Sequence, residues 1–172
     1  MKPIKNKEFA RHEQFDPELT AEGPGRRVVL LHNIRSRFNV GSIFRTADGA
    51  GVNKIYLCGI TPAPPHPNIE KVSLGAEKNI PFEKIRNTIP LIKKLRAEGF
   101  QIVALEQNKK SILYNKFKPK NKVALILGTE VSGLPPKILK LADKIIEIPM
   151  LGKKESLNVS VAFGIATYQI RK

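Results

Sequence analysis

Three stretches of the sequence place glycines and polar side chains immediately after a short apolar run. They are LLHNIRSRFNVGSIFRTADGAGV at residues 30–52, ALILGTEVSGLPPKIL at 124–139 and IPMLGKKESLNVSVAFGIATYQI at 148–170. Short continuous apolar runs are typical of strands that are buried on both faces of a parallel sheet. Ligands of open α/β sheets bind at the carboxyl ends of such strands. The three stretches therefore predict a binding site at that edge of a sheet.

The first stretch combines arginines with a predicted helix start. Asn39 suits the N-cap of a helix over residues 40–50, and Arg45 then lies in the second turn of that helix. Arg35 and Arg37 belong to the turn that precedes it. Small residues on either side of Arg45 indicate tight packing around it, and an arginine held in this way favours a phosphate or a carboxylate. The alternative is structural, with Asn39 only capping the helix and Arg45 only pairing with an acidic residue.

The second and third stretches supply groups that suit a ligand bound largely by the main chain. Gly128 directly follows an apolar run, and a glycine there allows a ligand to approach the backbone closely. Glu130 can pair with a cation or cap the helix that follows. The apolar segment IPMLG at residues 148–152 suits a flat, mostly apolar ligand. Ser156 and Asn158 are both candidates for the N-cap of the last helix.

Several other chemistries lack their sequence patterns. There is no G-x-G-x-x-G dinucleotide loop and no G-x-x-x-x-G-K-[ST] phosphate loop. The three histidines, His12, His32 and His66, lack metal-ligand spacing, so no metal is expected. The single cysteine, Cys58, lies in the apolar run KIYLCGI and is predicted to be a core residue. One cysteine, no long apolar run and no signal-peptide pattern together lead us to expect a cytoplasmic protein without membrane contact.

The charge balance favours a polyanionic partner. Lys and Arg number 30 against 15 Asp and Glu, which gives a formal net charge of +15. Such a protein attracts nucleic acid through phosphate contacts and counterion release. The basic segment QNKKSILYNKFKPKNK at residues 107–122 contains Lys116, Lys118 and Lys120. These lysines either contact phosphates or form a solvated loop, and the sequence leaves both open.

Apolar periodicity and turn residues predict an α/β domain with a mostly parallel sheet and helices on both faces. Residues 1–25, broken by glycines and prolines, are predicted to be a polar N-terminal extension, and residues 26–172 a single domain. The segment TPAPPHPN at 61–68 is predicted to exclude helix. The last helix is apolar over a wide arc, which indicates burial against a partner. Strands are expected at 28–31, 54–58, 100–105, 123–127 and 145–148, and helices at 40–50, 88–98, 136–141 and 158–170.

The three stretches, taken in order, resemble the three motifs of the SpoU (TrmH) family within the SPOUT methyltransferases. The patterns N-x-G-x-x-x-R-T, G-x-E-x-x-G-L and I-P-M-x-G-x-x-x-S-L-N-V-S-V-A are all intact. The resemblance covers about residues 27–170 and implies a fold that periodicity does not reveal. In that fold the C-terminal segment threads a loop to form a deep trefoil knot, an exception to the usual unknotted topology.

The resemblance also implies a cofactor, roles for individual residues and a homodimer whose sites are completed by the partner chain. S-adenosylmethionine is expected to bind bent in the knot. Arg45 corresponds to the catalytic arginine of the family. The residues implied as active-site polar groups are Asn39, Glu130, Ser156 and Asn158. Those implied as cofactor contacts are the backbone at Gly128, Ile148 and Leu157, with Leu105 and Met150 as apolar walls.

We therefore predict an enzyme that transfers a methyl group from S-adenosylmethionine to a ribose 2′-hydroxyl of structured RNA, either tRNA or rRNA. Arg35, Arg37 and the three lysines of the basic segment are the predicted RNA contacts. One alternative is a non-catalytic RNA-binding protein on the same fold, and another is a methyltransferase that acts on a base nitrogen. A DNA-binding protein lacks support because no recognition-helix motif is present.

Overall fold

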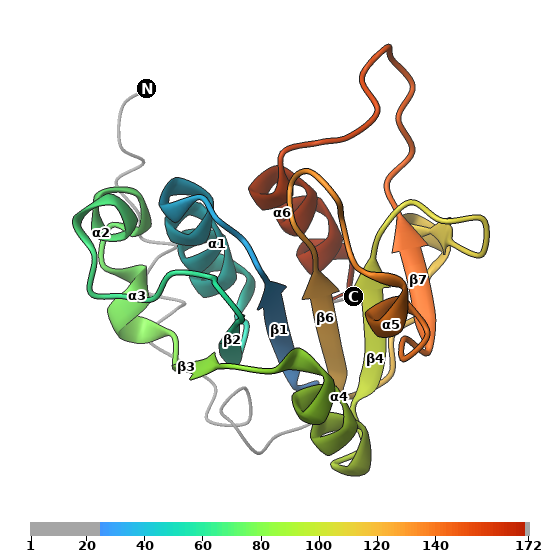
Figure 1. The fold of residues 1–172 in the computed structure, drawn as a ribbon, viewed down its shortest axis with the longest axis horizontal. Helices are drawn as coiled ribbons and strands as arrows, with labels where there is room; N and C mark the ends of the chain where they lie inside the picture. Colours follow the sequence, from blue (N-terminus) through green and yellow to red (C-terminus); the bar gives the residue numbers. More distant parts are fainter. Residues whose placement is uncertain (1–24, 171–172) are drawn as a thin grey trace, which may run out of the picture.

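A computed structural model describes residues 25–170 and contains the expected α/β domain (Figure 1). The predicted extension, residues 1–25, lies outside the described residues except for Gly25. The strands are β1 (Arg27–His32), β2 (Lys54–Cys58), β3 (Phe82–Ile85), β4 (Gln101–Leu105), β5 (Ile112–Leu113), β6 (Val123–Leu127) and β7 (Lys144–Glu147). The helices are α1 (Arg37–Ala50), α2 (Pro67–Ser73), α3 (Ala76–Asn79), α4 (Thr88–Ala97), α5 (Pro136–Leu139) and α6 (Val159–Ile170), with a 3-10 turn η3 (Tyr114–Lys116).

Within the described residues the strands form one seven-stranded sheet in the order β3-β2-β1-β6-β4-β7-β5. Every strand pair in it is parallel. Strands β1, β6, β4 and β7 are neighbours, so their carboxyl ends meet at one edge of the sheet. The three motif stretches follow three of these four strands, which brings them together as the sequence predicts.

Helices cover both faces of the sheet because the strand side chains alternate between two apolar layers. Val29 and Leu31 of β1 pack in the layer that contains α1 and α6. Val28 and Leu30 pack in the opposite layer, beneath α4 and α5. Figure 1 shows α1 and α6 on one side of the sheet and α4 and α5 on the other. No helix among the described residues is long and apolar enough to span a membrane.

Two local predictions were wrong. Helix α1 begins at Arg37 and is capped by Ser36, whose hydroxyl accepts a hydrogen bond from the backbone N–H of Asn39 at 3.2 Å. Asn39 is therefore inside the first turn and does not cap the helix. The Pro-rich segment 61–68 does enter a helix, because α2 begins at Pro67. Proline is tolerated at a first helical position, where its missing N–H would have no partner in any case.

The remaining predicted elements agree with the structure to within a few residues. Besides α2, the elements that were missed are β3, β5, α3 and the 3-10 turn η3. Strand β3 has three exposed residues out of four and thus no continuous apolar run. Strand β5 has only two residues, and α3 has four. The trefoil knot implied by the family resemblance stays a prediction.

Candidate active site

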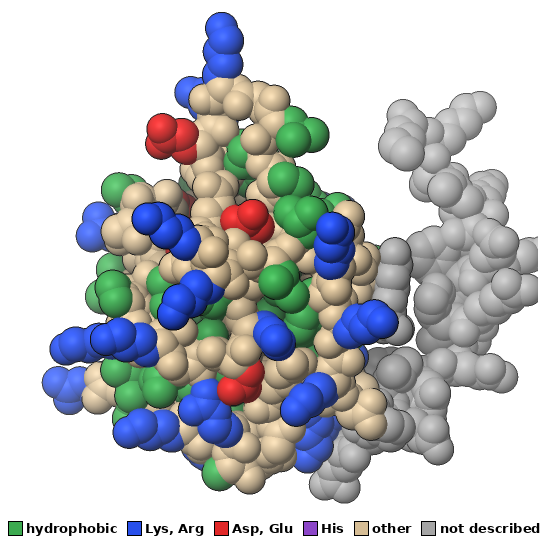
Figure 2. Space-filling model, turned by 90° about the vertical axis from the view of Figure 1, so that its right-hand side faces the viewer, with side chains coloured by type: hydrophobic (Ala, Val, Ile, Leu, Met, Phe, Trp, Pro, Cys, Tyr) green, Lys and Arg blue, Asp and Glu red, His purple; other side chains and the backbone are tan. Residues whose placement is uncertain are grey.

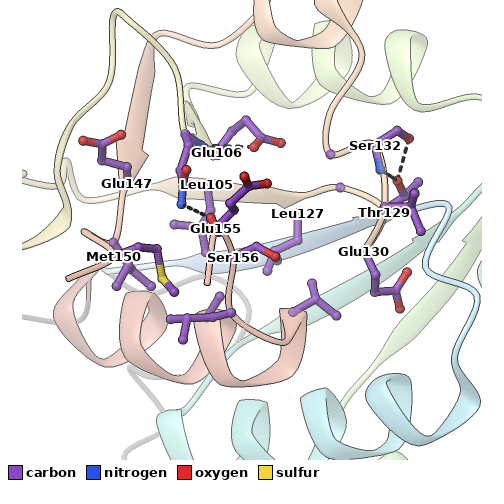
Figure 3. Close-up of a pocket in the computed structure, with 18 residues that line it drawn as sticks. Leu105, Glu106, Leu127, Thr129, Glu130, Ser132, Glu147, Met150, Glu155 and Ser156 are labelled. Carbon is purple, nitrogen blue, oxygen red and sulfur yellow. Dashed lines mark hydrogen bonds between the residues drawn. The ribbon is translucent and has the colours of Figure 1, made fainter. Parts of the chain in front are cut away.

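A pocket of about 420 Å³ lies at the carboxyl ends of β4, β6 and β7, closed on one side by the first turn of α6 (Figure 3). Its size suits a small organic ligand. Among its lining residues are all five predicted cofactor contacts, which are Leu105, Gly128, Ile148, Met150 and Leu157. Glu130 and Ser156, two of the predicted active-site polar residues, also line it. The second and third motif stretches thus converge on one cavity, although the role of each residue stays a prediction.

The loop between β6 and α5 forms one wall of the pocket and folds tightly on itself. A Cβ atom on Gly128 would lie 2.4 Å from the backbone carbon of Gly133. The close approach that requires glycine at position 128 is therefore an approach of the chain to itself. A larger side chain there would displace the loop, and the approach of a ligand to the Gly128 backbone stays a prediction.

Glu106, which the sequence analysis missed, ties this loop to the end of β4. Its Oε2 accepts a hydrogen bond from the backbone N–H of Leu134 at 2.8 Å, and its Oε1 accepts one from that of Gln107 at 3.1 Å. Gly133, with φ of +64°, lets the carboxylate pass, because a Cβ there would lie 2.2 Å from Oε2. The sequence signal that could have revealed Glu106 was a charged residue directly after an apolar strand.

Beside the pocket, three predicted polar residues form one hydrogen-bonded chain. The Asn39 amide nitrogen donates to Glu130 Oε1 at 3.0 Å, and its carbonyl oxygen accepts from Asn158 Nδ2 at 3.1 Å. The carboxylate can only accept, so it determines which way the Asn39 amide points. Asn158 also caps α6, accepting from the backbone N–H of Ser160 at 2.9 Å. The capping role of Asn158 is confirmed, and it coexists with a contact to the first motif.

These hydrogen bonds can form because α1 and α6 run side by side in the same direction. Asn39 meets Asn158 at their first turns. Further along, a Cβ on Gly164 would lie 3.6 Å from Thr46 Cγ2, and one on Gly49 would lie 3.2 Å from Tyr168 Oη. Small residues on both helices therefore permit the close approach.

Arg45 lies apart from the pocket, on the exposed side of α1. It follows Phe38 by seven residues, so the two side chains project from nearly the same side of the helix. Phe38 is itself 52% exposed. Tight packing around Arg45 was predicted wrongly, because the small residue Gly41 faces α2, where a Cβ would lie 2.5 Å from the Ile69 carbonyl oxygen. Within residues 25–170, Arg45 has no hydrogen-bonded or ion-paired partner.

The predicted RNA contacts lie at two ends of the sheet. Arg35 and Arg37 are exposed just before and at the start of α1, at the edge that holds the pocket. Lys116, Lys118 and Lys120 are exposed in the segment between β5 and β6. The backbone N–H of Lys120 donates to Gln101 Oε1 at 3.1 Å, at the start of β4. That position is four residues, roughly 13 Å, from the pocket end of the strand.

Burial shifts the pKa values of Cys58 and His32, the two other groups that could do chemistry near this edge. Cys58 is fully buried, and burial raises the pKa of its thiol to about 11, so it is a neutral core residue as predicted. The ring nitrogen Nδ1 of His32 lies 2.8 Å from Thr88 Oγ1, and burial lowers the pKa of this histidine. His, Cys, Asp and Glu side chains form no group suited to a metal ion in the described part of the chain.

Residues 26–168 match the model of the SpoU rRNA Methylase family. This chain belongs to that family. A tRNA (guanosine(18)-2′-O)-methyltransferase of Aquifex aeolicus is 34% identical to it over 145 residues, or 84% of this chain and 68% of the relative. The chain spans about two thirds of the length of such curated relatives.

Two solved structures share the fold at higher than 30% identity. The AdoMet-bound rRNA methyltransferase from Sinorhizobium meliloti is 34% identical and superposes with a TM-score of 0.81, over 86% of this chain and 56% of that one. The TrmH/SpoU tRNA modifying enzyme of A. aeolicus is 31% identical, with a TM-score of 0.79 over 95% of this chain and 82% of that one.

Proposed function

We propose that this chain is an S-adenosylmethionine-dependent RNA methyltransferase that modifies a ribose 2′-hydroxyl. The observation that carries the proposal is the pocket itself. Seven predicted residues line it, six of them from the motifs, and Glu130 connects it through Asn39 to Asn158. Family membership and the relatives named above, two of which act on tRNA and one on rRNA, support the same activity.

The pocket fits S-adenosylmethionine in size and in chemistry. Apolar side chains at Leu105, Ile148, Met150 and Leu157 can sandwich a flat base, and the tight loop at Gly128 presents backbone groups to it. The cofactor supplies a methyl group on a sulfonium, so that as the carbon–sulfur bond breaks and the carbon–oxygen bond forms, both electrons stay on sulfur. No metal is needed for such a transfer.

The remaining task for the protein is to position the hydroxyl and manage its proton. Arg45 is a poor base, because a guanidinium stays protonated in proteins and has no acceptor site. Its planar fork can instead hold the phosphate beside the target ribose and stabilise the developing oxyanion. That phosphate or water then takes the proton. A deprotonated Arg45 acting directly as the base is the second possibility. Asn39, Ser156 and Asn158 would orient the ribose in line with the methyl group.

The exposed position of Arg45 agrees with a homodimer in which one protomer supplies it to the pocket of the other. Large apolar side chains are exposed on the same side of the molecule, on α1 and on α6. They are Phe38 at 52%, Val161 at 51% and Tyr168 at 53% exposure. Covering these residues with a second copy would bury apolar area and bring Arg45 near the dimer interface. The trefoil knot and a cytoplasmic location belong to the same proposal.

The substrate is proposed to be structured RNA, with tRNA preferred over rRNA. The net charge of +15 supports binding to a polyanion. Figure 2 shows Lys and Arg side chains spread over the face on the β5–β7 side, with few acidic ones among them. Arg35 and Arg37 would contact phosphates near the reacting ribose, whereas Lys116, Lys118 and Lys120 would hold a more distant part of the RNA.

Nucleoside mass spectrometry of total RNA, with and without the gene, tests this function. We expect one 2′-O-methylated nucleoside to disappear from the tRNA fraction when the gene is deleted and to return on complementation. A loss from rRNA would correct the substrate. A lost base methylation would support the base-nitrogen alternative, and an unchanged profile would support a non-catalytic RNA-binding protein.

A further inference from the structure

The pocket carries the opposite sign of charge to the rest of the protein. The chain has 30 Lys and Arg against 15 Asp and Glu, yet every formally charged side chain that lines the pocket is a glutamate. The four are Glu106, Glu130, Glu147 and Glu155, and no lysine or arginine is among the lining residues. Figure 3 shows the four glutamates distributed around the pocket.

No basic side chain in the described part of the chain pairs with these carboxylates. Their hydrogen bonds come from neutral donors: Glu106 accepts from backbone N–H groups, Glu130 from Asn39, and Glu147 from the hydroxyl of Ser111 at 2.6 Å. Negative charge that has no counterion inside a concave site creates a potential that attracts cations.

We infer that the pocket selects its ligand by charge and holds the methyl donor more tightly than the demethylated product. This inference rests on the proposed cofactor. The donor carries a sulfonium, whereas the product carries a neutral thioether and is poorer by one positive charge. Glu147 and Glu155 are the selecting residues, because Glu106 holds the loop and Glu130 holds Asn39. Within residues 25–170, Glu147 accepts only from the hydroxyl of Ser111, which does not line the pocket. Each methyl transfer therefore lowers the affinity of the pocket for the bound cofactor. The demethylated product is then replaced more readily by a new methyl donor.

Calorimetry tests the inference with S-adenosylmethionine, S-adenosylhomocysteine and sinefungin, an unreactive analogue with an amine at the methyl position. We expect both cationic ligands to bind more tightly than S-adenosylhomocysteine. The affinity ratio should fall as salt rises from about 0.05 M to about 1 M, because salt screens charges. Glu147→Gln and Glu155→Gln should each lower the ratio about threefold, and the double variant about tenfold. Glu70→Gln, an exposed change on α2, is the matched control and should leave the ratio unchanged.

The outcomes separate this inference from the proposed function. Equal binding of all three ligands to the unmodified protein, or a ratio that neither salt nor the double variant alters, would overturn charge selection and leave the cofactor assignment intact. If none of the three ligands binds, the proposed function and the inference are overturned together. The salt series uses the unmodified protein, so it decides the question even where a variant does not fold.

Discussion

The side-chain amide of Asn158 donates a 3.1 Å hydrogen bond to the side-chain carbonyl of Asn39, a residue 119 positions earlier in the chain. The bond joins the first turns of α1 and α6 and continues to Glu130 at the pocket. The first and last motifs thus form one rigid polar unit. Its orientation is set at one end by a carboxylate that only accepts, and at the other by the capping bonds of Asn158.

Replacing Asn39 should therefore damage methyl transfer more than cofactor binding. In the unmodified protein the side-chain nitrogen of Asn39 donates to Glu130 at 3.0 Å. Asn39→Asp removes this bond to a charged group and places a second carboxylate against Glu130. We expect the single-turnover rate to fall about tenfold to 100-fold, which corresponds to roughly 1.5–3 kcal/mol. Asn87→Ala is the control, since Asn87 precedes α4 without a side-chain capping bond. Equal loss in both variants would remove the positioning role of Asn39.

The loop that Glu106 holds should be sensitive to the loss of Gly133. Gly133→Ala adds a methyl group 2.2 Å from Glu106 Oε2 and should lower affinity for S-adenosylmethionine about tenfold, because the loop must shift. Gly75→Ala has a comparable left-handed backbone, φ of +92°, and nothing within 4 Å of the added methyl. Both variants should lose about 1–2 kcal/mol from backbone strain. If calorimetry finds the same affinity in the two proteins, the loop is not part of the cofactor site.

The proposed dimer can be checked by light scattering. We expect a mass of about twice the 19.2 kDa chain at micromolar concentration. Val161→Glu places a charge within the exposed apolar face of α6 and should shift the protein towards the monomer. Ile60→Glu changes an exposed apolar residue outside both helices and should leave the mass unchanged. A monomeric unmodified protein would contradict the shared-site arrangement.

Sequence patterns predicted the parts of this molecule that follow from local chemistry. Buried parallel strands such as β6 appear as continuous apolar runs, and Gly99 directly follows α4 and its cap. The start of α1 was less determined, because Ser36 and Asn39 are both good N-caps three residues apart. The choice of Ser36 leaves the side chain of Asn39 free to meet Glu130 and Asn158.

Long-range arrangement accounts for what the sequence did not predict. The residues of β6 do not by themselves predict that this strand lies between β1 and β4. This strand order brings the motifs to one edge of the sheet. The charge reversal in the pocket has the same origin, because its glutamates come from separate segments. The exposure of Arg45 was accessible from helical spacing, because Val40, Ile43, Phe44 and Ala47 form an apolar stripe on the opposite side of α1.

Single-turnover methylation by Arg45→Ala and Arg45→Lys tests whether this chain methylates a ribose with the help of Arg45. The substrate is tRNA from a strain that lacks the gene, with radiolabelled S-adenosylmethionine, and digestion then locates the label on ribose or base. We expect ribose label with the unmodified enzyme and a loss of about 100-fold or more in Arg45→Ala. Arg45→Lys should recover little, because lysine lacks the bidentate fork, while calorimetry finds normal cofactor affinity in both variants. Near-normal rates in Arg45→Ala, or label on a base, would contradict the account.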